Sequence, residues 1–326
     1  MLSDVLMMFA GIGAFLTGMK LCSLNLEAVA GGRVEKLFTK LSDRKLAGVG
    51  IGVGSAAVLQ SSSATTVILL GLVNSGIVSL FQATCIIMGA NIGTTFTALI
   101  ISLNYLPISE LFAFMTFIGM MTVMAAKRSR VRTAGWILTS IGLIFIGLEI
   151  IKAGAVNLKS NEIFLNLFSG MTSPLLLLTV GVAFTAVIQS SSAVTGIVIT
   201  LAQLGIMPVT ATFYIIMGSN VGSCATAMLA AIGGSLNARR TAMIHLLFNA
   251  IGVILFLPFV IIFGEKTVDA LNVFSPSVII AYFHIAFNLV TTLVLLPFVK
   301  ALANLACLMV GDKQTNACNK DENVVQ

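Results

Sequence analysis

The stretch GSAAVLQSSSATT, residues 54 to 66, places a glutamine and three serines inside an otherwise apolar run. The same four letters, QSSS, return at residues 189 to 192. Adjacent polar side chains at the centre of an apolar segment are costly in a bilayer, so they indicate either a ligand site or helix contacts. Their recurrence suggests that the segments around the two motifs are related.

Composition places the chain in a membrane. Of its 326 residues, 58% are hydrophobic and 9% are charged, and the mean hydropathy is +1.05. Apolar runs of about 20 residues match the length of a helix that crosses a hydrocarbon core of about 30 Å. The sequence therefore predicts an all-α polytopic membrane protein, with residues 1–310 as the membrane domain and 311–326 as a polar cytoplasmic tail.

The net charge of +6 does not indicate nucleic acid, because the basic residues gather in short connections. Clusters lie at 20–45, 127–132, 239–240 and from Lys300 onward. The remaining lysines share their connections with acidic residues near Glu149, Glu162 and Glu265. Because basic loops stay in the cytoplasm, the pattern predicts an external N-terminus and a cytoplasmic C-terminus.

A shift of 129 residues aligns 60–98 with 189–227 without a gap, and eighteen of the 39 positions are identical. The first copy follows a basic segment and leaves into an uncharged one, whereas the second does the reverse. These flanks predict two inverted-topology repeats, at about 43–105 and 172–235.

Each repeat must cross the membrane an odd number of times, yet turn signals at 74–76 and 205–208 divide it into two long apolar runs. The conflict disappears if the first run, about 46–76 or 174–205, is a re-entrant helical hairpin with QSSS near its tip. The second run then crosses the membrane. Irregular backbone at that depth is tolerated only beside protein or a water-filled cavity, which predicts a ligand site.

The expected site carries no charge, because residues 46–109 and 163–238 contain no Asp, Glu, Lys, Arg or His. Hydroxyl and amide oxygens suit Na⁺, while hydroxyls, backbone N–H groups and helix N-termini suit an oxyanion. The predicted substrate- and sodium-binding residues are Gln60, Ser61, Ser62, Ser63, Thr65, Thr66, Asn91, Thr94, Gln189, Ser190, Ser191, Ser192, Thr195, Asn220 and Ser223. The competing interpretation is that these hydroxyls bond back to their own helices and that the glycines around Asn91 and Asn220 pack helices together.

Two later segments share a pattern, HLLFN at 245–249 and HIAFN at 284–288. Each places His and Asn one helical turn apart, so His245, Asn249, His284 and Asn288 are candidates for support of the site. A neutral imidazole bonded across a helix interface explains them equally well. No carboxylate or cysteine accompanies either histidine, which argues against a transition-metal site. The 129-residue offset places Thr116 opposite His245, which predicts no symmetric role for the histidines.

With its paired QSSS motifs, the GANIGTT stretch at 89–95 and the HxxFN segments, the chain resembles the type II sodium-dependent phosphate cotransporters, in their bacterial branch. The resemblance covers about residues 1–305. It implies symport of inorganic phosphate with Na⁺ in a bacterial inner membrane, with both QSSS regions forming the site. Many bacterial members continue into a PhoU-like cytoplasmic domain, whereas this chain ends in a short polar tail.

Two alternatives stay open at this point: a sodium-coupled carrier of another small anion, such as a carboxylate, and a phosphate sensor that does not transport. An enzyme is not expected, because the core offers no general acid, base or activated nucleophile. The sequence allows a homo-oligomer without defining one. It leaves open the sodium stoichiometry, the direction of transport and the phosphate species.

Overall fold

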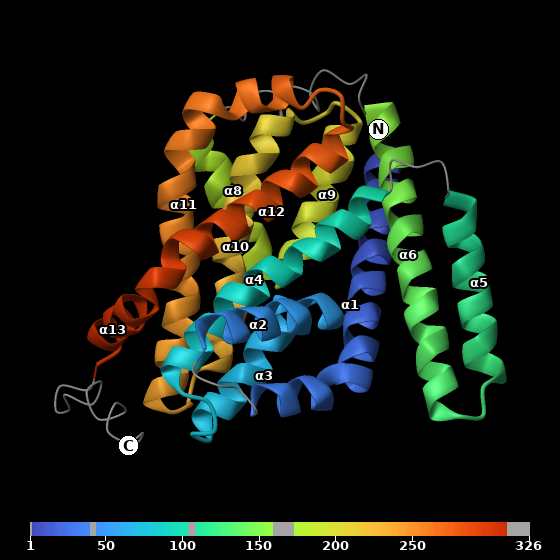
Figure 1. The fold of residues 1–326 in the computed structure, drawn as a ribbon. Coiled ribbons are helices and arrows are strands. Elements are labelled where there is room, and N and C mark those ends of the chain that lie inside the picture. Colours follow the sequence, from blue (N-terminus) through green and yellow to red (C-terminus); the bar gives the residue numbers. More distant parts are fainter. Residues whose placement is uncertain (1, 40–43, 104–108, 159–172, 312–326) are drawn as a thin grey trace.

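The computed structural model describes residues 2–39, 44–103, 109–158 and 173–311, and it confirms the all-helical prediction, since this part of the chain holds helices and no strand. Figure 1 shows their arrangement. In chain order the helices are α1 (Leu2–Phe38), α2 (Lys45–Leu59), α3 (Ser62–Asn74), α4 (Leu80–Ser102), α5 (Ser109–Ala125), α6 (Ser129–Leu158), α8 (Pro174–Ile188), α9 (Ser191–Gln203), α10 (Val209–Ala230), α11 (Leu236–Ala270), α12 (Pro276–Leu295), the 3₁₀ turn η2 (Leu296–Phe298) and α13 (Val299–Met309). The predicted polar tail lies almost entirely outside the described residues.

Six helical segments in the described ranges are long and apolar enough to cross a membrane: Leu2–Phe38, Leu80–Ser102, Ser129–Val156, Val209–Ala230, Leu236–Ala270 and Pro276–Met309. The chain is therefore a multi-pass membrane protein. The helices before and after each QSSS motif are different, because they have only 13 or 15 residues. At 1.5 Å per residue each spans about 20 Å, which is less than the hydrocarbon core.

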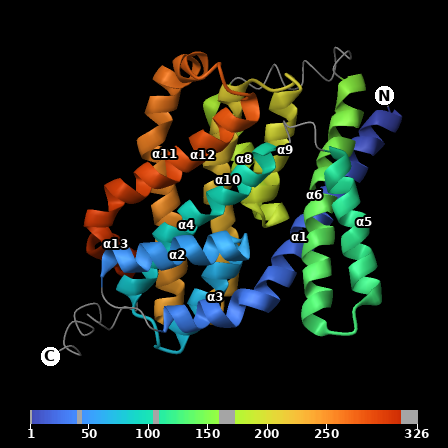
Figure 2. The same cartoon turned by 45° about the vertical axis from the view of Figure 1, so that its right-hand side comes forward.

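The helix boundaries repeat with the offset seen in the sequence. The starts of α2, α3 and α4 at residues 45, 62 and 80 correspond to those of α8, α9 and α10 at 174, 191 and 209. Both turns before the long helix contain a glycine with positive φ, Gly76 at +75° and Gly205 at +67°. Figures 1 and 2 place α2 and α3 in the lower half of the molecule and α8 and α9 in the upper half.

Glycines bring the first short helix of each repeat against the long helix. A Cβ on Gly52 of α2 would meet the backbone of α4 near Ile86, and one on Gly89 of α4 would meet the Val49 carbonyl. The equivalent glycines of the second repeat, Gly181 and Gly218, face α10 and α8 in the same way. The packing interpretation of these glycines is thus confirmed for the GANIG and GSNVG stretches.

The two repeats also contact each other: the second short helix of each repeat touches the long helix of the other. The helix α3 touches α10, and α9 touches α4. The helix α11 contacts α3, α4 and α10, while α12 contacts α9, α10 and α4. The structural counterpart of α11 is therefore α12, and both HxxFN segments lie against the two long repeat helices. The 129-residue offset does not detect this relation, because the two segments are only 39 residues apart.

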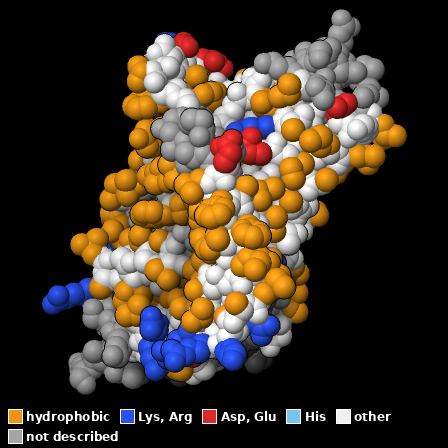
Figure 3. Space-filling view, turned by 90° about the vertical axis from the view of Figure 1, so that its right-hand side faces the viewer, with side chains coloured by type: hydrophobic (Ala, Val, Ile, Leu, Met, Phe, Trp, Pro, Cys, Tyr) orange, Lys and Arg blue, Asp and Glu red, His pale blue; other side chains and the backbone are white. Residues whose placement is uncertain are grey.

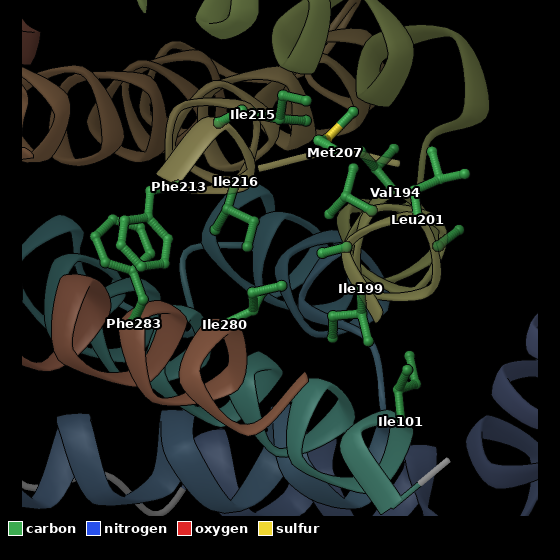
Figure 4. Close-up of a cluster of buried hydrophobic side chains, with 14 of the residues drawn as sticks. Ile101, Val194, Ile199, Leu201, Met207, Phe213, Ile215, Ile216, Ile280 and Phe283 are labelled. Atoms are coloured by element: carbon green, nitrogen blue, oxygen red, sulfur yellow. The ribbon is translucent and has the colours of Figure 1, made fainter. Parts of the chain in front are cut away.

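One of the buried hydrophobic clusters joins α4, α9, α10 and α12 (Figure 4). Ile199 of α9, Ile216 of α10, Ile280 of α12 and Ile101 of α4 are all buried in one cluster. Phe213 of α10 stacks on Phe283 of α12 with ring centroids 4.0 Å apart. This packing fixes α10 against α12 next to the polar residues described below.

An outer group of helices completes the fold. The helices α1 and α6 make an extended contact, in which a Cβ on Gly147 would meet Phe15. The helix α5 packs on the outer side of α6 (Figures 1 and 2). On the face shown in Figure 3, most Lys and Arg side chains gather at one end, hydrophobic side chains cover the middle, and Asp and Glu lie towards the other end.

Candidate substrate and ion site

The first helix break lies at Gln60 and Ser61. Gln60 has a left-handed backbone with φ of +52° and ψ of +28°, which ends α2. Ser61 is extended, and its Oγ accepts a hydrogen bond from the N–H of Ala64 at 3.1 Å, which caps α3. The Gln60 side chain is held on both sides: Nε2 donates to the Ala57 carbonyl at 2.6 Å, and Oε1 accepts from Thr97 Oγ1 of α4 at 3.0 Å.

The second break has the same backbone and different side-chain contacts. Gln189 adopts φ of +58°, and Ser190 Oγ accepts from the N–H of Ala193 at 3.2 Å. Gln189 is exposed, however, and Thr226, which corresponds to Thr97, has a buried Oγ1 with no partner among the described residues. The two equivalent glutamines are therefore in different states in one structure.

Each break leaves N–H groups at the positive end of a short helix without a partner inside that helix. The N–H groups of Ser62 and Ser63 in α3, and of Ser191 and Ser192 in α9, belong to a first turn and have no carbonyl four residues before them within the helix. Such N–H groups, together with the helix dipole, favour an anion. No charged side chain lies on α3, α4, α9 or α10 to compete with them.

The predicted site residues differ in exposure. Gln60, Ser61, Ser63 and Ser190 are partly buried. The buried positions are Ser62, Thr65, Thr66, Asn91, Thr94, Ser191, Ser192, Thr195, Asn220 and Ser223. The structure brings each set together within its own repeat, through contacts of α3 with α4 and of α9 with α10.

Several hydroxyls bond back to their own helix, as the packing interpretation expects. Thr65 Oγ1 donates to the Ser61 carbonyl at 2.9 Å, Thr94 Oγ1 to Ala90 at 3.0 Å and Ser223 Oγ to Asn220 at 2.7 Å. A hydroxyl that donates its hydrogen keeps its oxygen lone pairs, so each of these groups can still accept a hydrogen bond or bind a cation. None of them can donate a hydrogen bond to an anion at the same time. Thr195 Oγ1 is buried with no partner in the described ranges.

Asn91 and Asn220 occupy equivalent positions with opposite amide arrangements. Asn91 Nδ2 donates to the Ile87 carbonyl of its own helix at 2.9 Å. Asn220 instead places Oδ1 at 3.3 Å from His284 Nε2, and its Nδ2 has no partner in the part of the chain that the structure describes. Asn91 therefore forms its hydrogen bond through the amide nitrogen, whereas Asn220 forms its hydrogen bond through the amide oxygen.

The two HxxFN segments lie in the buried interior. His245, Asn249, His284 and Asn288 are at most 1% exposed. Asn249 and Asn288 each donate from Nδ2 to the carbonyl of the histidine one turn earlier, at 3.0 Å. Only His284 bonds to a predicted site residue; both ring nitrogens of His245 lack a partner among the described residues.

Sequence reasoning missed three contributors. Thr97 holds Gln60, and its identity with Thr226 in the aligned repeats was an available signal. Thr185 Oγ1 donates to Ser219 Oγ at 2.8 Å, and Ser219 Oγ lies 3.5 Å from the Ser191 carbonyl. The first repeat has Ala56 and Ala90 at those two positions, so a search for repeated polar residues could not find them.

An apolar pocket of about 230 Å³ borders the first break, between α1, α6 and the α2–α4 pair. Gln60 and Thr97 contribute to a lining that otherwise consists of aliphatic residues, Phe145 and Cys22. Such a lining is unsuited to an anion. The described residues also contain no group of three or more His, Cys, Asp or Glu that could hold a metal ion.

Comparison with known proteins decides the class. The profile of the Na⁺/Pi-cotransporter family matches residues 14–153 and 156–311. The chain belongs to this family. Its members are transporters rather than enzymes, and the match agrees with the resemblance drawn from the QSSS, GANIGTT and HxxFN motifs.

Individual relatives agree with this assignment. The chain is 31% identical to the uncharacterized protein YqeW of Bacillus subtilis over 249 residues, which are 75% of this chain and 79% of YqeW. It is 29% identical to the putative inorganic phosphate export protein YjbB of Escherichia coli over 281 residues, covering 86% of this chain and about half, 51%, of YjbB. Over 94 residues it is 37% identical to human sodium-dependent phosphate transport protein 2B, covering 27% and 14% of the two chains. No solved structure matches the chain.

Proposed function

We propose that this protein is a sodium-coupled symporter of inorganic phosphate. The observation that carries the proposal is the pair of helix breaks at Gln60 and Gln189, each followed by a serine-capped helix N-terminus in uncharged surroundings. The N–H groups of these termini bind the phosphate, and Na⁺ beside it balances the charge that no arginine or lysine supplies. The names of the phosphate transport relatives support this substrate.

Sodium is assigned to the oxygen atoms around the breaks. Hydroxyls that donate to their own helix, such as Thr65 and Thr94, still offer lone pairs, and backbone carbonyls at the breaks add to them. The absence of carboxylates on α3, α4, α9 and α10 disfavours a proton relay. Na⁺ is therefore cargo of the cycle, and no resident cofactor is required.

The membrane arrangement we propose is that of inverted repeats. The pairs α2–α3 and α8–α9 are re-entrant hairpins that approach from opposite sides, and α4 and α10 cross the membrane. The basic end seen in Figure 3 is the cytoplasmic end, in a bacterial inner membrane, so that the N-terminus is external and the C-terminus cytoplasmic. The short lengths of α2, α3, α8 and α9 support this arrangement.

Transport then follows alternating access around the breaks. The unequal states of the two glutamines support such a cycle: Gln60 is held by Thr97, whereas Gln189 is exposed and Thr226 Oγ1 is unpartnered among the described residues. In the state that opens to the other side of the membrane, Gln189 accepts a hydrogen bond from Thr226, and Gln60 no longer accepts one from Thr97. The direction of net transport depends on the gradients and on the number of Na⁺ carried.

Competition in sealed proteoliposomes tests the substrate. Labelled phosphate uptake is measured with unlabelled phosphate, arsenate or a dicarboxylate outside. Arsenate has the shape and charge of phosphate, so it should inhibit about as well as phosphate, while the dicarboxylate should not. Inhibition and uptake of the dicarboxylate would instead make the protein a carrier of organic anions. Phosphate binding to the purified protein without any flux would make it a sensor.

A further inference from the structure

Asn220 carries a half-satisfied amide in the interior of the protein. The residue is 4% exposed, its Oδ1 lies 3.3 Å from His284 Nε2, and its Nδ2 has no partner in the described part of the chain. A buried amide nitrogen without a partner is costly, because it has lost its bonds to water. Its two N–H groups are therefore free for a ligand.

The contact with His284 engages the oxygen end of the Asn220 amide, with Oδ1 facing Nε2. An amide oxygen can only accept a hydrogen bond, so Nε2 of His284 carries the hydrogen. His284 is 1% exposed, and its neighbour Phe283 stacks on Phe213 of α10 (Figure 4), which holds α12 against α10 at this level. Asn288 also donates to the His284 carbonyl at 3.0 Å. With Oδ1 held in this way, Nδ2 is turned away from His284.

Asn220 lies on the turn of α10 that also contacts the first turn of α9 after the second break. Ser219, the residue before Asn220, has its Oγ 3.5 Å from the carbonyl of Ser191 in the first turn of α9. Asn91 does not offer the same chemistry, because its Nδ2 already donates to the Ile87 carbonyl. Of these two equivalent asparagines, only Asn220 offers both amide hydrogens to a ligand.

We propose that His284 is a positioning residue that orients the Asn220 amide so that its N–H groups face the phosphate. The inference rests on the proposed function, because it requires an anion at the second break. Without His284 the amide can rotate by 180° and present its oxygen, which repels an anion. His284 thus acts on anion affinity through Asn220 and does not touch the phosphate.

Equilibrium binding of labelled phosphate to the full-length protein in detergent, with Na⁺ present, tests this role. His284→Leu should raise the Kd for phosphate about tenfold, which corresponds to the loss of one hydrogen bond. His284→Gln can place an amide N–H near the position of Nε2, so it should restore the Kd to within about threefold of wild type. Thr292→Val is the matched control: it removes a buried hydrogen bond from α12 to the Met88 carbonyl and should leave the Kd unchanged.

A double-mutant cycle separates orientation from general stability. Asn220→Ala should weaken binding by at least about tenfold, and adding His284→Leu should change the Kd no further. A Kd in His284→Leu equal to that of wild type would overturn the proposal, as would effects that simply multiply in the double variant. Absence of phosphate binding to wild type would overturn it too. Wild-type binding without sodium-dependent uptake would refute the symporter function alone.

Discussion

At the scale of single residues, the two glutamines with positive φ organise the candidate site. Gln60 and Gln189 are the only non-glycine residues with positive φ in the described ranges, and both precede a serine that caps the next helix. A left-handed backbone is unfavourable for most residues, so its retention at both positions points to a requirement of the site. We propose that these two positions serve ligand binding rather than stability.

Gln60→Ala and Gln189→Ala should each reduce sodium-dependent phosphate uptake by at least about tenfold while the protein still inserts into the membrane. The loss follows because the side-chain amide is removed at the break, next to the N–H groups assigned to the anion. Uptake per amount of reconstituted protein measures the effect. Gln203→Ala, at the far end of α9, is the matched control and should transport normally. Unchanged uptake in both break variants would refute the assigned site.

The sequence predicts these residues because each QSSS motif is contiguous and the two motifs are identical. The repeat by itself pairs Gln60 with Gln189 and Asn91 with Asn220. It could not predict that the two asparagines orient their amides differently, because that depends on His284 from a distant helix. Thr185 and Ser219 escaped detection for a similar reason: their hydrogen bond exists in one repeat only.

At the scale of elements, close helix contacts hold the breaks in place. The pairs α2–α4 and α8–α10 approach so closely that a Cβ on Gly89 would meet the Val49 carbonyl and one on Gly218 would meet the Leu178 carbonyl. Backbone atoms cannot move aside as a flexible side chain can. Each short helix is therefore packed directly against the helix that carries Asn91 or Asn220.

Gly89→Ala and Gly218→Ala should each destabilise the protein by about 1 to 3 kcal/mol, because the added methyl group overpacks a backbone contact. Thermal unfolding in detergent measures the change as a lower midpoint. Gly50→Ala is the control, since a Cβ there meets nothing within 4 Å, and the midpoint should not fall. Equal midpoints for Gly89→Ala and Gly50→Ala would contradict the close packing of α2 on α4.

The equivalence of α11 and α12 could not be predicted from the 129-residue offset between the repeats. Each repeat helix set was recognisable from its own residues, but the structural counterpart of α11 follows it directly in the chain rather than following the first repeat. The fixed offset places Thr116 opposite His245, whereas the shared HxxFN pattern pairs His245 with His284. The helices α11 and α12 are equivalent because they make corresponding contacts with the two repeats, and their separation in the sequence differs from the offset between the repeats.

At the scale of the whole molecule, charge distinguishes the two ends of an otherwise apolar body. The connection around residues 127–132 carries four basic residues, whereas the end of α11 carries Glu265 and Asp269 with a single lysine. These connections lie at opposite ends in Figure 1. Basic loops remain in the cytoplasm during insertion, which orients the protein as we propose.

Labelling of single cysteines tests this orientation. In a chain whose five native cysteines are replaced, a membrane-impermeant maleimide should label Asp269→Cys in intact cells. It should label Ser129→Cys only after the membrane is opened. Both positions are exposed, so accessibility within the protein does not confuse the comparison. Labelling of Ser129→Cys alone in intact cells would reverse the assigned topology.

Labelled phosphate uptake into proteoliposomes that contain the purified wild-type protein tests sodium-coupled phosphate symport directly. A sodium-coupled symporter should accumulate phosphate when Na⁺ is higher outside than inside, and it should accumulate none when K⁺ replaces Na⁺ or when only a pH gradient is applied. Accumulation that is independent of Na⁺, or no phosphate movement by folded protein under any of these gradients, would contradict sodium-coupled phosphate symport.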